Sequence, residues 1–262
     1  MKEIAHRGYS DLHKDNTKCA FMSSVLYQFD MIELDIQLTK DDRIIIYHDT
    51  FLKDQLIINK NYHEILQDNK DIISLEEFFE FIDVSKIQIY LDIKGNELKI
   101  ASILNDLIKN NPYHYNIFLA SFNLSIIQEL YKLNPRLQLG FITENMFPKD
   151  IFSQMIKEYH LRFISFHWTM LDLSIIEFLH CNHVMVFTYT AKNKEILSFM
   201  EDYEIDGIIT NGKLLDYRKG IYKKKKDIQK ESILTTILST LTSLTSLTTL
   251  STFQIKNFFK KE

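Results

Sequence analysis

Short apolar runs alternate along the chain with segments in which apolar residues recur every three or four positions. Apolar runs of about four to eight residues are typical of buried strands, and the longer period is typical of helices that pack on a sheet. Met31–Gln37 shows the first pattern. Glu97–Lys109 shows the second, with Ile100, Leu104 and Leu107 on one face. Regular alternation of the two patterns predicts βαβ units that pair into a parallel sheet.

The alternation can be followed from the first residues to about residue 210. The predicted strands are Ile4–Ala5, Met31–Gln37, Arg43–His48, Gln88–Lys94, Asn116–Ser121, Leu137–Ile142, Arg162–Phe166, Val184–Thr190 and Gly207–Thr210. The predicted helices are one capped by Asp15 or Asn16, one from the capping box at Ser74 to Ile82, and then Glu97–Lys109, Ser125–Leu133, Lys149–Tyr159, Leu173–Leu179 and Glu195–Tyr203.

The number of β units favours one fold over its main alternative. If Arg43–His48 is a paired extension of Met31–Gln37, eight β units remain, which is the number that closes a TIM (β/α)8 barrel. An open doubly wound sheet is the alternative, but no Gly-rich phosphate loop follows the first strand. We therefore predict an α/β protein with a TIM barrel.

Two segments depart from the alternation. Residues 49–73 form a polar insertion after the second β unit, with a weak helix around Tyr62–Leu66, and we expect it to stand over the barrel mouth. Residues 1–222 are predicted to form the barrel, and 223–262 a basic, Leu/Ser/Thr-rich, low-complexity tail. Two interpretations of the tail stay open: a loosely helical or disordered extension, and a membrane anchor or interfacial helix.

Composition narrows the function only slightly. The chain has 262 residues, 45% of them hydrophobic, and a net charge of −4, which argues against a general nucleic-acid binder. The first residues contain no apolar segment of the kind found in secretory signals. A cytoplasmic location is therefore the expectation, with membrane association through residues 223–262 as the alternative.

Chemically versatile side chains gather near the predicted ends of the first strands. They are His6, Arg7, Glu33, Asp35 and His48. Residues two apart on a strand share a face, so both acids can bind one hard cation, and an arginine beside them indicates a bound phosphate oxygen. Two imidazoles can divide the base and acid roles of a displacement. This combination predicts metal-assisted cleavage of a phosphoester.

The next predicted strand adds two groups to the same face of the barrel. Asp92 and Lys94 lie at its end, where barrel enzymes carry their active sites. Asp92 would be a third oxygen ligand beside Glu33 and Asp35, which is enough for Mg²⁺ or Ca²⁺ when water and substrate complete the shell. No Cys/His set suggests zinc.

Ordered motifs across most of the chain resemble those of glycerophosphodiester phosphodiesterases. They are Ala-His-Arg-Gly at 5–8, Lys-Asp-Asn-Thr at 14–17, Ile-Glu-Leu-Asp-Ile-Gln-Leu-Thr-Lys-Asp at 32–41, Tyr-His-Asp at 47–49, Leu-Asp-Ile-Lys at 91–94, Ala-Ser-Phe at 120–122, Val-Met-Val-Phe-Thr at 184–188 and Asp-Gly-Ile-Ile-Thr at 206–210. The resemblance implies a TIM-barrel hydrolase of lipid metabolism. Such an enzyme splits glycerophosphodiesters into an alcohol and glycerol 3-phosphate with a divalent cation.

The resemblance also implies a role for each matching residue. His6 and His48 correspond to the acid/base pair, and Glu33, Asp35 and Asp92 to the metal ligands. The implied substrate-binding and supporting groups are Arg7, Asn16, Lys94 and Phe187. For Phe187, packing on the substrate and packing in the barrel core stay open, and His167 and Trp168 are expected at the same face.

The residues that differ from the family pattern lie where the site is expected to bind the alcohol or glycerol part of the substrate. The usual Trp is Phe187, the usual Asn is Thr190, and the usual Asp after the last strand is Asn211. Two alternatives therefore accompany the prediction: a lysophospholipase D-like enzyme that acts on lysophospholipids at a membrane, and a non-catalytic barrel that binds phosphodiesters.

Overall fold

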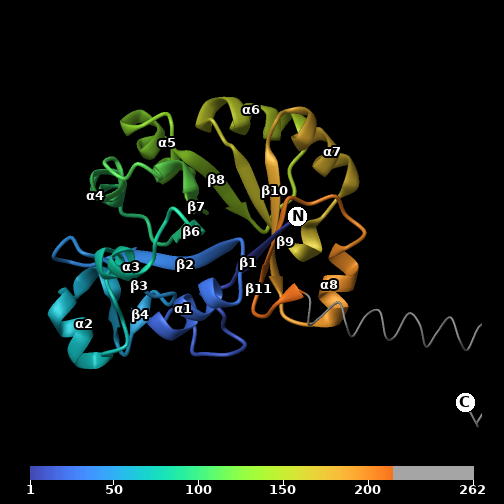
Figure 1. Cartoon of the computed structure of the whole chain (residues 1–262). Coiled ribbons are helices and arrows are strands. Elements are labelled where there is room, and N and C mark those ends of the chain that lie inside the picture. Colours follow the sequence, from blue (N-terminus) through green and yellow to red (C-terminus); the bar gives the residue numbers. More distant parts are fainter. Residues whose placement is uncertain (215–262) are drawn as a thin grey trace, which may run out of the picture. The chain divides into compact units, whose positions relative to one another are not determined.

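The computed structural model of the protein describes residues 1–214. In that part of the chain, eight parallel strands close into a barrel in the order β1-β11-β10-β9-β8-β7-β6-β2, and β1 also pairs with β2 (Figure 1). The short strand β3 pairs antiparallel with β2 outside the barrel. This arrangement confirms the predicted TIM barrel and the predicted role of the third apolar run as an extension of the second.

The observed elements lie close to the predicted ones. The barrel strands are β1 (Lys2–Ala5), β2 (Met31–Leu38), β6 (Gln88–Ile93), β7 (Ile117–Ser121), β8 (Gln138–Thr143), β9 (Phe163–His167), β10 (Met185–Ala191) and β11 (Gly207–Thr210), and β3 is Ile44–Ile46. The helices are α1 (Lys18–Leu26), α2 (Tyr62–Asp68), α3 (Leu75–Phe81), α4 (Lys99–Ile108), α5 (Leu124–Leu133), α6 (Lys149–Tyr159), α7 (Leu173–Cys181) and α8 (Lys194–Met200).

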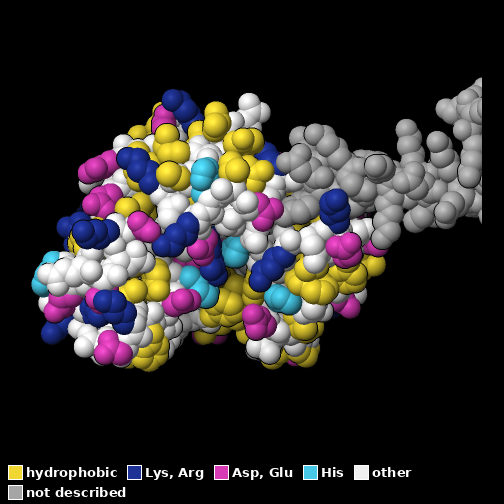
Figure 2. Space-filling model, turned by 90° about the horizontal axis from the view of Figure 1, so that it is seen from below, with side chains coloured by type: hydrophobic (Ala, Val, Ile, Leu, Met, Phe, Trp, Pro, Cys, Tyr) yellow, Lys and Arg dark blue, Asp and Glu magenta, His cyan; other side chains and the backbone are white. Residues whose placement is uncertain are grey.

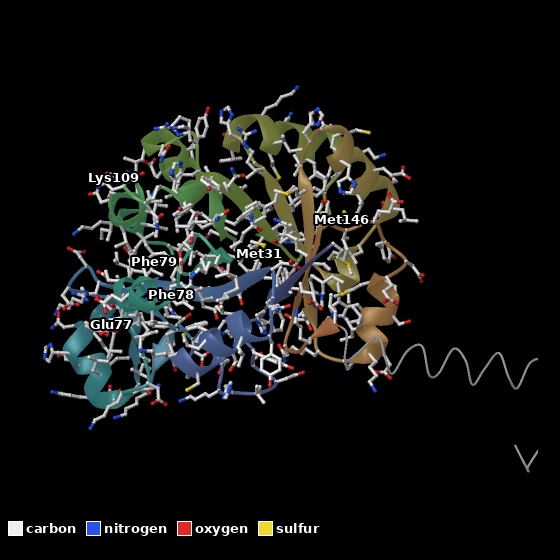
Figure 3. All side chains as sticks on the ribbon, viewed as in Figure 1. Met31, Glu77, Phe78, Phe79, Lys109 and Met146 are labelled. Carbon is white, nitrogen blue, oxygen red and sulfur yellow. The ribbon has the colours of Figure 1, made fainter. Side chains whose placement is uncertain are left out.

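Side chains from alternate positions of the strands fill the barrel interior. The cluster includes Ile4, Met31, Phe118, Phe163 and Phe187, all at most 4% exposed. Met31 of β2 lies near the centre of the barrel in Figure 3, whereas Phe78 of α3 packs on Phe21 of α1 in the outer layer. Because side chains alternate along a strand, the inward position of Met31 also places residues 33 and 35 on the inner face.

The insertion after the second β unit is better ordered than predicted. It contains a two-stranded hairpin, β4 (Phe51–Leu52) with β5 (Gln55–Leu56), a 3-10 turn at Ile57–Asn59, and α2. Ile57, Ile65 and Ile72 pack with Ile45 of β3 in a small core of their own. This separate core holds the segment at the edge of the barrel.

Helix caps show one correct and one incorrect prediction. Ser74 and Glu77 form the predicted reciprocal capping box at the start of α3. The first helix is instead capped by Thr17, whose hydroxyl accepts a hydrogen bond from the Ala20 amide. Asp15 and Asn16 do not cap it because the first pairs with Arg7 and the second with Asp35.

No helix within residues 1–214 is long and apolar enough to cross a membrane. The boundary predicted at residue 222 and both interpretations of the tail lie outside the described residues.

Candidate active site

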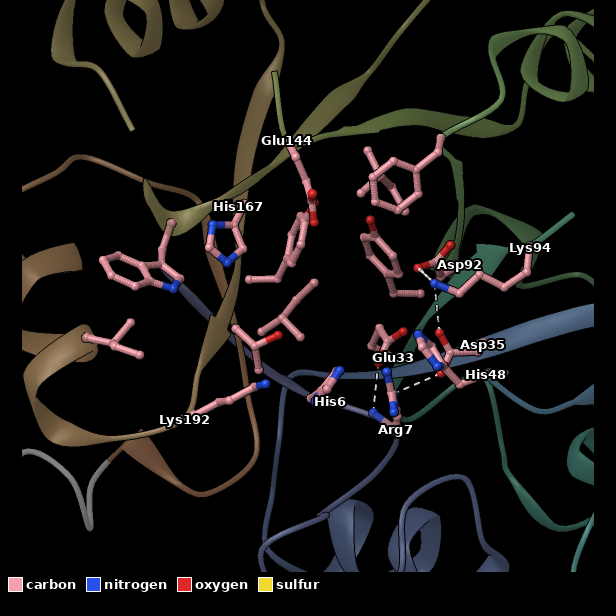
Figure 4. Close-up of a pocket in the computed structure, with 18 residues that line it drawn as sticks. His6, Arg7, Glu33, Asp35, His48, Asp92, Lys94, Glu144, His167 and Lys192 are labelled. Atoms are coloured by element: carbon pink, nitrogen blue, oxygen red, sulfur yellow. Dashed lines mark hydrogen bonds and ion pairs between the residues drawn. The ribbon is translucent and has the colours of Figure 1, made fainter. Parts of the chain in front are cut away.

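A pocket of about 360 Å³ opens at the carboxyl ends of the barrel strands. Figure 2 views this end of the barrel and shows histidine and charged side chains near the centre of the face. Seven of the predicted site residues line one side of the pocket, called the reaction wall below: His6, Arg7, Glu33, Asp35, His48, Asp92 and Lys94. The far wall is the name used below for Glu144, His167, Trp168, Tyr189 and Lys192, which also line the pocket. Figure 4 shows Glu144 and His167 across the pocket from the acids, and Lys192 beside His6.

Three buried carboxylates form the centre of the reaction wall. Glu33, Asp35 and Asp92 are at most 8% exposed, and one oxygen from each lies within 4.8 Å of the others. Asp35 and Asp92 come together because they are register partners on the neighbouring strands β2 and β6. Apolar residues at 32, 34 and 36 face the helices, so the alternation of β2 forces both of its acids into the barrel.

Two cations compensate part of this negative charge. The Lys94 ammonium lies 2.6 Å from Asp92 and 3.1 Å from Asp35, and the Arg7 Nε lies 3.0 Å from the other Asp35 oxygen. Burial raises the pKa of Asp35, but Lys94 and Arg7 outweigh that effect, so its pKa is lowered and it stays ionised. The pKa of Lys94 is raised in turn because both carboxylates outweigh its burial.

The other two acids are not fully compensated. Burial, together with the charges of Asp35 and Asp92, raises the pKa of Glu33 well above its ordinary value. Burial raises the pKa of Asp92 to about 6, and its buried Oδ1 atom has no hydrogen-bond partner among residues 1–214. Three clustered carboxylates, one with an orphaned oxygen, fit a hard divalent cation, which would relieve both the repulsion and the missing contact.

His6 is held by a residue from the far end of the described chain. Its Nδ1 lies 2.7 Å from the amide oxygen of Asn211, which follows β11, so Nδ1 carries the proton and Nε2 is left for the pocket. Burial and the charge of Arg7 lower the pKa of His6 to about 4. The imidazole is therefore neutral near pH 7.

A tight turn after β1 brings Arg7 back over the acids. Arg7 and Gly8 both have positive φ angles, 56° and 80°. At Gly8 a Cβ atom would meet the Ala20 backbone at 2.7 Å, so this position requires glycine. The turn also directs the Arg7 amide to Glu33, with N···Oε2 at 2.8 Å.

His48 occupies the opposite edge of the reaction wall. It follows β3, and its Nδ1 lies 2.8 Å from the carboxylate of Asp49. The Gln37 amide donates to the carbonyl oxygens of Tyr47 and Asp49, at 2.7 and 2.9 Å, and so fixes the loop on both sides of the histidine. Gln37 was not predicted as a site residue, although the sequence places it on the same strand as Glu33 and Asp35.

Two predicted substrate-binding residues lie outside the pocket. Asn16 is buried and donates from Nδ2 to Asp35 at 2.9 Å, so it supports an acid and does not line the cavity. Phe187 is completely buried among Tyr90, Phe118 and Phe163 in the barrel core. Of its two open interpretations, the structure supports core packing and does not bring Phe187 to the cavity.

The far wall contains residues that the motifs did not identify. His167 and Trp168 were expected at this face and do line the pocket, but Glu144, Tyr189 and Lys192 were not predicted. Glu144 and Lys192 follow β8 and β10 directly, so a search for polar residues just beyond each strand would have found them.

Comparison with known proteins agrees with this geometry. The sequence profile of the glycerophosphoryl diester phosphodiesterase family matches residues 6–212. A glycerophosphodiester phosphodiesterase of Caldanaerobacter subterraneus is 28% identical over 79% of this chain and 93% of its own. The crystal structure of a glycerophosphodiester phosphodiesterase from Thermotoga maritima matches 80% of this chain and 94% of its own, with 25% identity and a TM-score of 0.69.

A human lysophospholipase D, GDPD1, is 29% identical over 53% of this chain. The matched part spans about half of that protein's length, 51%. The profile match covers most of the chain and includes every residue of the reaction wall. The chain therefore belongs to the glycerophosphoryl diester phosphodiesterase family, as the motifs predicted, and is a phosphoric diester hydrolase.

Proposed function

We propose that this protein hydrolyses glycerophosphodiesters to an alcohol and glycerol 3-phosphate with a divalent cation and a pair of histidines. One observation carries the proposal: three buried carboxylates, two cationic side chains and two imidazoles line the same side of one pocket. A site that only bound a phosphodiester would gain nothing from two imidazoles held in fixed orientations beside the charges.

Glu33, Asp35 and Asp92 would hold the cation, and their all-oxygen set favours Mg²⁺ or Ca²⁺. When bound, the ion supplies charge neutralisation of the phosphodiester and polarisation of its phosphorus centre. Arg7 and Lys94 border the same space and would take the remaining charge on the phosphate oxygens.

The surroundings of the histidines suggest different roles for them. His6 is partly buried and neutral, and its Nε2 has no partner among residues 1–214, which suits a general base that takes a proton from water or from a neighbouring substrate hydroxyl. The contact with the Asp49 carboxylate holds the Nδ1 side of His48 and leaves Nε2 for the substrate, and we assign His48 as the acid that protonates the leaving alkoxide.

Alanine substitution of each histidine tests the proposal. His6→Ala and His48→Ala should each lower kcat on glycerophosphocholine by at least about a hundredfold, since a general acid or base contributes about 10²–10⁴. His63→Ala, at an exposed histidine of α2, is the matched control and should keep full activity. Circular dichroism would show whether each variant is folded, and an active, folded His6→Ala or His48→Ala would refute the assignment.

A lysophospholipase D activity is the second candidate. An apolar groove of about 690 Å³ shares Lys94 and Phe122 with the pocket and is walled by Leu124, Phe147 and Met155. It could hold an acyl chain, and the human relative with 29% identity carries the name lysophospholipase D. Membrane contact by residues 223–262 would support this activity, but it concerns residues outside the described part of the chain.

Parallel assays on glycerophosphocholine and lysophosphatidylcholine with Mg²⁺ or Ca²⁺ separate the candidates. Faster turnover of lysophosphatidylcholine would favour the lipid-directed activity. Cation binding without turnover of either substrate would favour the third interpretation, a non-catalytic phosphodiester-binding barrel.

A further inference from the structure

The far wall differs from the reaction wall in the chemistry of its surface. Three rings, those of His167, Trp168 and Tyr189, line it side by side. The His167 ring centroid lies 5.6 Å from that of Trp168 and 5.7 Å from that of Tyr189. Each of these residues is only partly buried, so its ring contributes surface to the cavity.

A single carboxylate accompanies these rings. Glu144 follows β8, and its charge is among the causes of the raised pKa of Tyr189, after burial. Among residues 1–214, the Glu144 carboxylate has no ion-pair or hydrogen-bond partner. Glu144 is exposed at the pocket mouth and lies close enough to Tyr189 to act on its pKa. Aromatic faces attract a quaternary or primary ammonium group, and a nearby carboxylate adds charge attraction.

The charges in the pocket are separated along its length. The positive groups Arg7 and Lys94 border the acids, and Lys192 lies toward His6, whose pKa its charge helps to lower. Glu144 and His167 lie at the other side of the cavity from the cluster of Glu33, Asp35 and Asp92 (Figure 4). Cations therefore surround the place of the phosphate, and one anion lies beyond it among the rings.

This pattern complements a zwitterion. A glycerophosphodiester of an amino alcohol carries a negative phosphate and, one short linker away, a positive ammonium group. A neutral alcohol such as glycerol would leave Glu144 without a partner, and an anionic alcohol would be repelled by it.

We propose that the far wall is the alcohol subsite and selects glycerophosphodiesters whose alcohol carries an ammonium group, with Glu144 and the Trp168 ring as the recognition elements. The inference rests on the proposed hydrolysis and names its substrate class. Glycerophosphocholine is the clearest member of this class, because a trimethylammonium group cannot donate hydrogen bonds and relies on charge and ring faces.

The test compares kcat/KM for glycerophosphocholine with kcat/KM for glycerophosphoglycerol, whose alcohol is neutral. The wild-type ratio should favour choline by about tenfold or more, as a partly desolvated cation–ring contact with a nearby carboxylate predicts. Glu144→Gln and Trp168→Leu should each lower this ratio about tenfold. Glu177→Gln, at an exposed residue of α7, is the matched control and should leave the ratio unchanged.

A second readout needs no turnover of a choline substrate. Tetramethylammonium should inhibit glycerophosphoglycerol hydrolysis by the wild type, and Glu144→Gln should weaken that inhibition about tenfold. Lys192→Gln should lower kcat/KM for both substrates in parallel.

The outcomes distinguish the proposed hydrolysis from the proposed alcohol subsite. Hydrolysis of neither substrate would refute the proposed function itself. Hydrolysis of both at equal rates, or a ratio that Glu144→Gln does not change, would refute only the alcohol subsite.

Discussion

The two walls of one pocket are built in different ways. The reaction wall buries three acids and compensates them with short ion pairs, such as Lys94 to Asp92 at 2.6 Å and Arg7 to Asp35 at 3.0 Å. The far wall has partly exposed rings and two isolated charges, Glu144 and Lys192, that lie on loops. One wall is a network of ion pairs between buried groups, and the other is a group of packed, partly exposed rings with two charges that form no ion pair among residues 1–214.

This difference predicts how substitutions in each wall affect stability and activity. A residue of the network has several partners, so its loss leaves other buried groups unpaired. A residue of the far wall forms no buried ion pair among residues 1–214 and is partly or fully exposed, so its loss should affect substrate binding more than stability. We therefore expect stability and activity to fall together on the reaction wall and to separate on the far wall.

The largest contrast should come from Asp35, which contacts Arg7, Lys94 and Asn16. Asp35→Asn removes the charge that both cations require, and should destabilise the fold by about 3 kcal/mol. It should also lower kcat about 10³-fold. Urea unfolding and steady-state kinetics measure the two effects. Trp168→Leu, from the far wall, should change stability by less than about 1 kcal/mol. Equal destabilisation by both variants would remove the contrast.

A second expectation concerns pH and the acids of the reaction wall. Without a cation, burial and mutual repulsion raise the pKa of Glu33 well above its ordinary value and that of Asp92 to about 6, so both acids bind protons at a higher pH than an ordinary carboxylate does. A cation must displace those protons, so its affinity should fall as the pH falls. Isothermal titration calorimetry should show that the affinity for Mg²⁺ falls at least about tenfold from pH 7 to pH 5.5. An affinity independent of pH would contradict this account.

The smallest effect is expected at Asn211, where the family usually has Asp. Asn211→Asp places a carboxylate against His6, favours the imidazolium, and so raises the pKa of His6 from about 4. Because the base must be neutral, the acid limb of the kcat/KM profile should move up by about one pH unit, with little change at pH 8. Asn123→Asp, at the N-cap of α5, is the matched control and should leave the profile in place.

Much of the reaction wall was predictable because its residues lie in short motifs on strands. The alternation in β2 predicted that Glu33 and Asp35 point inward, and the register of β2 with β6 explains how Asp92 joins them. The strand Gly207–Thr210 and the helix Lys149–Tyr159 have the predicted bounds. In these elements the hydrophobic pattern of the sequence is enough to predict the observed structure.

The failures have physical reasons. Phe187 lies on the inner face of β10, as a substrate-binding residue would, but one layer too deep. Tyr189, two residues further along the strand, reaches the pocket instead. Asp15 and Asn16 suit a helix cap, yet contacts with Arg7 and Asp35 take their side chains and leave Thr17 to cap. Glu144 and Lys192 directly follow β8 and β10 but belong to none of the motifs, so comparison of motifs did not identify them.

The pairing of β1 with β11 has a consequence for the timing of activity. Asn211, the partner of His6, emerges during synthesis 205 residues after the histidine. A nascent chain that has reached α4 already contains all three carboxylates, yet its His6 has no orienting partner. Catalytic competence should therefore appear in a single late step, when the last strand closes the barrel.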